Sequence, residues 1–290
     1  MEVKEILKTV KKLQIKTAMK SEGLVAGAYH SIFRGRGIEF SEAREYVPGD
    51  DIRSIDWNIT ARMNAPYVKE FIEERDLSVY IVFDVSGSSD FGSQKSKKDA
   101  SLEAAASLIF AALSNNDRVG LCMFSSGAEK FIPSKKGRKH ALRLLREMAA
   151  YSPKNSATNL ESALMFLSRA IKTKSIIFVI SDFISGDFSH ALKILKSRHD
   201  VVAVKIGDAR EEALPDIGYV MLEDSETGEQ MLVNTSDPEI RKKYADIAQK
   251  NRDALGRSIK KARTDVLEIS ATDDAHAKLR GFFAARGRRR

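Results

Sequence analysis

Short apolar runs alternate with amphipathic segments over most of the chain, and this alternation constrains the fold more than any other feature of the sequence. The runs at residues 77–84 and 175–182 are apolar along nearly their whole length, as in strands that are buried on both faces. Between such runs, segments such as 99–116 place apolar residues at helical spacing. Buried strands separated by helices predict an α/β fold with a doubly wound, mostly parallel, Rossmann-like sheet. The expected strands are 77–84, 118–126, 129–134, 175–182, 200–208 and 265–271; the expected helices are 99–116, 139–151, 159–171, 188–199, 238–261 and 274–285; and 219–234 is expected to form a hairpin.

The part of the chain that precedes this pattern has a different texture. Residues 1–22 have apolar side chains on one helical face, whereas residues 23–76 are rich in glycine and charge and are expected to be irregular, with short strands. We therefore expect an N-terminal helix and irregular extension at 1–76, an α/β domain at 77–285 and a basic tail at 286–290.

Composition bears on compartment and partners. The single cysteine, Cys122, excludes an intrachain disulfide and predicts a reducing, cytoplasmic location. No apolar stretch is long enough to cross a bilayer, and the first twenty residues lack the apolar core of a signal peptide, so membrane insertion is not expected. The net charge of +8 suggests an acidic partner. Nucleic acid is not favoured as that partner, because the basic residues form no aromatic-interleaved recognition motif, and the arginines of the tail are expected to be a frayed, solubilising end.

Polar side chains follow two of the expected strands. Asp84 ends the run at 77–84, with Ser86 and Ser88 at alternate positions after it, and Asp182 ends the run at 175–182. In an open α/β sheet, ligands bind outside the carboxyl ends of the strands where the strand order reverses. If the order is 3-2-1-4-5-6, the two aspartates meet at one rim, and their repulsion favours a shared proton or a bound cation.

The hydroxyl groups near this rim favour the cation. Ser86 and Ser88 alternate, so both can point the same way, and Thr158 lies just before an expected helix beside the rim. Carboxylates and hydroxyls without His or Cys form an all-oxygen set that suits Mg²⁺, with Ca²⁺ or Mn²⁺ as alternatives. Water or a partner's carboxylate would complete the coordination. A polar cap on the strand ends, without a metal, is the other interpretation.

This set resembles the metal-ion-dependent adhesion site (MIDAS) of von Willebrand factor type A domains. That pattern is Asp-x-Ser-x-Ser, a distal threonine and a later aspartate, matched here by Asp84, Ser86, Ser88, Thr158 and Asp182. One departure is an alanine before the threonine, where many relatives have glycine. The resemblance implies a type A-like fold and reversible, metal-dependent binding of a protein, with an acidic side chain of the partner completing the coordination.

A second resemblance covers nearly the whole chain. The segment "GRGIEFSEAREYVPGDDIRSIDWNITAR" at residues 35–62, together with "DSETGE" and "VNTSD" further on, is similar to the bacterial family called domain of unknown function 58. Members of that family carry a type A domain and are commonly paired with MoxR-type AAA+ ATPases. The resemblance implies a cytosolic adaptor or co-chaperone that binds such an ATPase or its client.

The segment at residues 35–62 has two interpretations. Its acids and arginines can form a paired polar network around an aromatic core of Tyr46 and Trp57, which would fasten an irregular subdomain to the sheet. Alternatively, the segment is a docking face for the ATPase or its client. The candidate docking residues are Arg44, Asp50, Asp51, Arg53, Asp56, Trp57 and Arg62.

Enzyme classes find little support. A haloacid dehalogenase-type phosphatase needs a second aspartate two residues after the first, where this chain has Ser86. Nucleotide-binding glycine loops, H-E-x-x-H and G-x-S-x-G are also missing from the sequence. A divalent-metal-dependent hydrolase is one alternative function, although it needs a general base at the rim. A nucleic-acid-binding protein, with affinity that falls steeply with salt, is the other.

Overall fold

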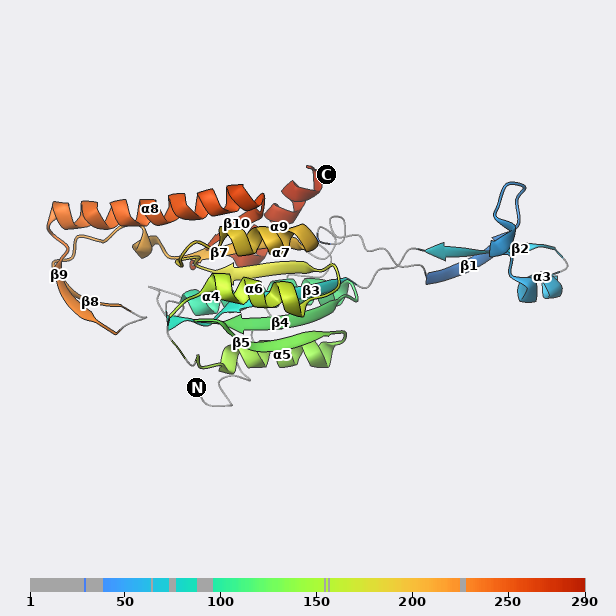
Figure 1. The fold of residues 1–290 in the computed structure, drawn as a ribbon, viewed down its shortest axis with the longest axis horizontal. Helices are drawn as coiled ribbons and strands as arrows, with labels where there is room; N and C mark the ends of the chain where they lie inside the picture. Colours follow the sequence, from blue (N-terminus) through green and yellow to red (C-terminus); the bar gives the residue numbers. More distant parts are fainter. Residues whose placement is uncertain are drawn as a thin grey trace. The chain divides into compact units, whose positions relative to one another are not determined.

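The computed structural model describes residues 29, 39–63, 65–72, 77–87, 96–153, 155, 157–224 and 228–289. The chain divides into two compact units, one formed by residues 1–32 and 78–290 and the other by residues 33–77 (Figure 1). The helix expected at residues 1–22 and the expected site residue Ser88 lie outside the described residues.

A six-stranded sheet forms the centre of the larger unit, in the order β10-β7-β6-β3-β4-β5. Neighbouring strands are parallel, except that β5 runs antiparallel to β4 at one edge. This order confirms the expected doubly wound α/β fold, and it places the reversal of strand order between β3 and β6. The strands are β3 (Ser78–Asp84), β4 (Arg118–Phe124), β5 (Ala128–Lys135), β6 (Ile176–Ser181), β7 (Asp200–Gly207) and β10 (Asp265–Ser270).

Six described helices accompany this sheet. One set consists of α4 with α5 and α9 packed against it, and the other of α6, α7 and α8 packed in that order. Tyr80 and Val82 of β3 share a buried core with α6, α7 and α8. Because successive side chains of a strand point to opposite faces, Ile81 and Phe83 face the other layer. The helices are α4 (Lys97–Ser114), α5 (Arg138–Ala150), α6 (Leu160–Ala170), α7 (Ser189–Arg198), α8 (Pro238–Ala262) and α9 (Ala275–Gly287).

A short 3₁₀ helix and a hairpin occupy the connection between β7 and α8. The 3₁₀ helix η3 (Ala209–Glu211) follows β7, and the hairpin consists of β8 (Tyr219–Glu223) and β9 (Gln230–Asn234), as the sequence predicts. Within the described residues, none of the helices has both the length and the apolar character needed to span a bilayer.

The C-terminal end of the chain corrects one expectation. Arg286, expected in a frayed tail, lies in the last turn of α9, and its side chain is buried. Its guanidinium lies 2.7 Å from Asp200 and 3.0 Å from Asp265, the first residues of β7 and β10. The packing of α9 against the sheet therefore makes this arginine a structural residue and extends the helix into the expected tail.

The smaller unit is more regular than expected. β1 (Glu39–Glu45) pairs antiparallel with β2 (Tyr67–Ile72), and the 3₁₀ helix η1 (Ile52–Ser54) and the helix α3 (Trp57–Met63) lie between them in sequence. Tyr29, which precedes this unit in sequence, belongs to the larger unit and packs edge-on against Phe283 of α9.

Candidate metal centre

The carboxyl ends of β3 and β6 meet at the point where the strand order reverses. Phe83 pairs with Ile180 in the parallel register, so Asp84 ends β3 beside the end of β6, which Asp182 directly follows. Both aspartates are buried, with relative exposures of 6% and 8%. Two buried carboxylates at one sheet rim are the arrangement that the expected strand order implied.

Hydroxyl donors surround Asp84. One carboxylate oxygen, Oδ1, accepts hydrogen bonds from the backbone N–H and the Oγ of Ser86 at 2.9 and 2.6 Å. The other, Oδ2, accepts from Ser181 Oγ at 2.6 Å, and that same Oγ accepts from the N–H of Phe183. Burial, and then the negative charge of Asp182, raise the pKa of Asp84 to about 6, although these hydrogen bonds oppose the rise. The hydrogen bonds to Asp84 therefore offset only part of the cost of two negative carboxylates at this rim.

A lysine that sequence reasoning missed lies beside Asp182. Lys97, the first residue of α4, places its Nζ 2.8 Å from Asp182 Oδ2 and 2.5 Å from Glu211 Oε1. Asp182 Oδ1 accepts from the N–H of Ile184. Little in the sequence indicates this role, because the expected helix begins two residues later and Lys97 lies in a polar "KSKKD" stretch.

The structure places Thr158 less directly than the two aspartates. Thr158 is half-buried, and the N–H of the next residue, Asn159, donates to the carbonyl of Ser125 just after β4 at 2.7 Å. The N–H of Leu160 lies 3.4 Å from Ser185 Oγ in the loop after β6. These two contacts hold the segment that contains Thr158 beside the same rim. Ser86 bonds directly to Asp84, and Asp182 lies near enough for its charge to raise the pKa of Asp84, while Ser88 lies outside the described part of the chain.

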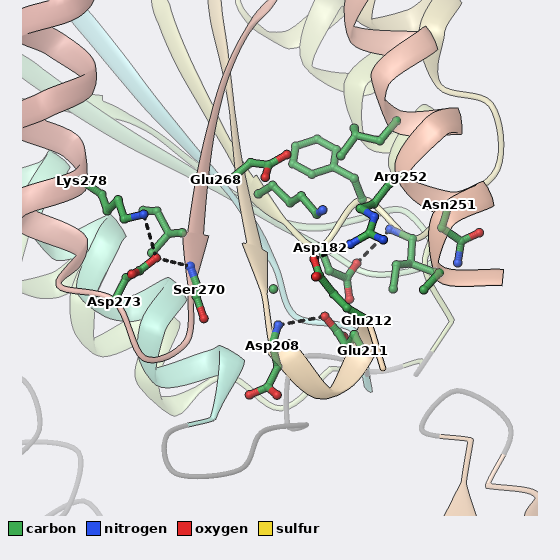
Figure 2. Close-up of a pocket in the computed structure, with 17 residues that line it drawn as sticks. Asp182, Asp208, Glu211, Glu212, Asn251, Arg252, Glu268, Ser270, Asp273 and Lys278 are labelled. Carbon is green, nitrogen blue, oxygen red and sulfur yellow. Dashed lines mark hydrogen bonds and ion pairs between the residues drawn. The ribbon is translucent and has the colours of Figure 1, made fainter. Parts of the chain in front are cut away.

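A cavity of about 310 Å³ adjoins this network at the carboxyl ends of β6, β7 and β10. Figure 2 shows Asp182 and Glu211 in its wall, with Glu211 accepting a hydrogen bond from the N–H of Asp208. Of the described residues, six with acidic and three with basic side chains line it. The excess of acidic groups favours the accumulation of cations next to Asp182.

The chemistry of these side chains suits a hard cation. Among the described residues, the connected cluster holds three carboxylates, of Asp84, Asp182 and Glu211, against the single ammonium of Lys97. A hydroxyl that donates its hydrogen to Asp84 still has oxygen lone pairs that can coordinate a metal. The described residues contain no group of three or more His, Cys, Asp or Glu side chains that could hold a metal by themselves, so the hydroxyls would have to contribute.

The candidate docking residues of the smaller unit fall into two groups. Asp50 accepts a bidentate pair of hydrogen bonds from Arg44, both at 2.8 Å, and this pairing lowers the pKa of Asp50 to about 2. Asp51 and Asp56 accept from nearby backbone N–H groups, of Arg53 and Asn58 respectively. Arg44 and Asp50 thus form one acid–arginine pair, whereas Asp51 and Asp56 bond to the backbone of the residues that follow them.

The aromatic core expected in this segment does not form around Trp57. The Trp57 side chain is 68% exposed, and those of Val47, Ile52 and Met63 are exposed as well. Arg53 and Arg62 are also exposed. The segment therefore presents apolar and basic side chains outward.

The sheet, its strand order and the rim define the larger unit as a von Willebrand factor type A-like domain. The chain belongs to the family described as "Protein of unknown function DUF58", whose model matches residues 42–254. Uncharacterized protein Rv1480 of Mycobacterium tuberculosis (strain ATCC 25618 / H37Rv) is 31% identical over 280 residues, which cover 95% of this chain and 88% of that protein. Uncharacterized protein YeaD of Bacillus subtilis (strain 168) is 30% identical over 110 residues, 38% of this chain and 25% of that protein.

A solved structure shares the fold. The crystal structure of an aerotolerance-related membrane protein from Bacteroides fragilis superposes with a TM-score of 0.53 at 17% identity, covering 74% of this chain and all of that one. At this identity the likeness concerns the arrangement of sheet and helices.

Proposed function

We propose that the chain is a metal-ion-dependent protein-binding module. The proposed ligands of one divalent cation, Mg²⁺ in preference to Mn²⁺ or Ca²⁺, are Asp84, Ser86, Ser88, Thr158 and Asp182. The observation that carries the proposal is the buried Asp84 carboxylate, which lies close enough to Asp182 for their charges to repel and receives two serine hydroxyls. A cation relieves that repulsion and uses the hydroxyl oxygens as further ligands.

Recognition is favoured over catalysis by the chemistry of the rim. A bound cation would supply an open coordination position for an acidic side chain of a partner. The carboxylates of Asp84 and Asp182 already accept hydrogen bonds from neighbouring groups. The Lys97 ammonium is paired with two carboxylates, so it is poorly suited to act as a general base. The side chains of this chain would therefore hold and orient the metal, and the partner's carboxylate would provide the specificity.

The partner that the family resemblance favours is a MoxR-type AAA+ ATPase or a client of it, with this chain as a cytoplasmic adaptor or co-chaperone. The outward-facing segment around Trp57 and Arg62 is the proposed second contact. A buried, unpaired thiol at Cys122 is consistent with a reducing compartment.

The metal part of the proposal is tested by calorimetric titration of MgCl₂ into the wild-type protein and into Asp84→Asn. We expect a saturable heat and a rise in Tm for the wild type, and neither for the variant. Asp246→Asn, which changes an exposed aspartate on α8, is the matched control and should behave as the wild type. Equal heats in the wild type and Asp84→Asn would refute metal binding at this position.

The partner part is tested separately by affinity capture with and without EDTA, read by mass spectrometry. A MoxR-type ATPase or a client that is retained with Mg²⁺ and released by EDTA supports the proposal, provided that Asp84→Asn fails to retain it. Retention that is indifferent to EDTA and to Asp84→Asn would contradict a metal-dependent contact.

A further inference from the structure

The ammonium of Lys97 stands inside the candidate metal centre. Its side chain is only 3% exposed, and it joins three separate elements: the start of α4, the residue after β6 and the end of η3. A buried ammonium is strongly unfavourable unless carboxylates pair with it. Here Asp182 and Glu211 do so, with carboxylate oxygens 2.8 and 2.5 Å from the ammonium nitrogen.

Lys97 pairs with the Asp182 carboxylate, which is also a proposed ligand of the metal. Asp182 Oδ2 is paired with Lys97 Nζ, and Asp182 Oδ1 is engaged by the N–H of Ile184. A divalent ion that uses Asp182, directly or through water, would lie within a few ångströms of the ammonium. Two cations at such a distance repel each other strongly in a partly buried site.

Glu211 gives the lysine a second partner when Asp182 is shared with a metal. Its Oε1 lies 2.5 Å from Lys97 Nζ. Its Oε2 accepts from the N–H of Asp208, the residue after β7 (Figure 2). Glu211 is therefore anchored to the sheet and would keep the ammonium paired. When the metal takes Asp182, the Lys97 ammonium would then still have Glu211 as its counter-ion.

We infer that Lys97 is a resident cation that balances Asp182 in the metal-free protein and weakens the binding of a divalent ion at the rim. The inference rests on the proposed metal site, and it explains how the rim stays folded without a metal. It also makes Lys97 and Glu211 the residues that set the affinity, which would keep metal binding reversible.

A purely structural role for Lys97, fastening the start of α4 to the sheet, predicts a different outcome. In that case, removal of the charge would lower stability and leave metal affinity unchanged or weakened. If Lys97 competes with the ion, removal of the charge would strengthen metal binding even though the metal-free protein becomes less stable.

The experiment measures the Kd of Mn²⁺, by calorimetry and by electron paramagnetic resonance of the free ion, for five proteins. These are the wild type, Lys97→Met, Lys97→Arg, Glu211→Gln and, as the control, Lys139→Met, which changes an exposed lysine on α5. We expect Lys97→Met to bind at least about tenfold more tightly, since a unit charge a few ångströms away at an effective dielectric constant near 20 is worth more than tenfold. Lys97→Arg should stay close to the wild type, because it keeps the charge. Glu211→Gln should bind more weakly, because Asp182 then holds Lys97 more firmly.

The outcomes separate this inference from the proposal on which it rests. If the wild type binds Mn²⁺ and folded Lys97→Met binds equally or more weakly, the role of Lys97 is refuted and the metal site stands. If only Lys97→Met binds, the inference holds and metal binding by the wild type is refuted. If neither binds, both are refuted. Should Lys97→Met fail to fold, a Glu211→Gln affinity equal to or above that of the wild type overturns the inference instead.

Discussion

Ser181 Oγ lies 2.6 Å from Asp84 Oδ2 and thereby joins the last residue of β6 to the last residue of β3. The register explains the contact, because Phe83 pairs with Ile180 and the next residues of the two strands lie opposite each other. Alternation along the strands then places both side chains on the face that packs against α6, α7 and α8. The strand register and the alternation of side chains therefore place the Ser181 hydroxyl next to the Asp84 carboxylate.

Ser181→Ala should destabilise the metal-free protein by about 1–3 kcal/mol at pH 7.5, because Asp84 loses a hydrogen bond to a buried charged group. Urea unfolding followed by circular dichroism measures the change. The control is Ser197→Ala. Ser197 is an exposed serine whose hydroxyl donates to a carbonyl in α7, so its replacement should change stability by less than about 0.5 kcal/mol. A Ser181→Ala variant as stable as the control would show that the hydroxyl does not support Asp84.

Arg286→Ala should destabilise the protein by about 2–4 kcal/mol at pH 7, because the variant leaves Asp200 with fewer cations around it. Burial raises the pKa of Asp200, but Arg286 and then Lys196 together outweigh it, and the net shift is downward. A carboxylate whose folded pKa is lowered contributes stability above its unfolded pKa and loses it as the pH falls. The difference between variant and wild type should therefore narrow as the pH falls below about 4.

Thermal unfolding at pH 7 and pH 3 measures both effects. The control is Arg288→Ala. Arg288 lies two residues further along the chain and is exposed, so its replacement should leave Tm nearly unchanged. If the two variants behave alike, Arg286 is part of a frayed tail after all.

The sequence predicted the sheet well because each central strand can be recognised from its own residues. A strand buried on both faces is apolar over its full length, so its end is visible as the first polar residue, as at Asp84 and Asp182. The two aspartates could be assigned to one rim because a doubly wound sheet has a fixed relation between strand order and ligand side.

The contacts of the site were not predictable in the same way. Ser181 meets Asp84 across 97 positions of sequence, and Lys97 meets Glu211 across 114. Such pairs depend on the register and on where a loop returns to the sheet, neither of which leaves a local pattern. Arg286 was misassigned for the same reason, since its burial comes from Asp200 and Asp265 and not from its arginine-rich neighbours.

Cys122 should be unreactive in the folded protein. It lies in the middle of β4 with no exposed surface, and burial raises the pKa of its thiol to about 12. At pH 8 roughly one thiol in ten thousand would be ionised, and the thiolate is the reactive form. We expect 5,5′-dithiobis(2-nitrobenzoic acid) to label the native protein slowly and the guanidinium-unfolded protein at the rate of free cysteine. Rapid labelling without denaturant would mean that β4 opens readily in the native protein.

Trp57 offers a direct test of the outward-facing segment, since it is the single tryptophan of the chain. Its side chain is 68% exposed, so acrylamide should quench its fluorescence in the native protein nearly as strongly as in the unfolded one. If this surface docks the proposed partner, complex formation should shift the emission to shorter wavelength and reduce the quenching, because a bound partner would exclude water from the indole. Trp57→Phe, which removes the signal and keeps an aromatic ring, should retain more of the affinity than Trp57→Ala, and both should unfold at nearly the same urea concentration as the wild type. A native spectrum already shifted to shorter wavelength and protected from acrylamide would instead place Trp57 in a buried contact and remove it from the docking surface.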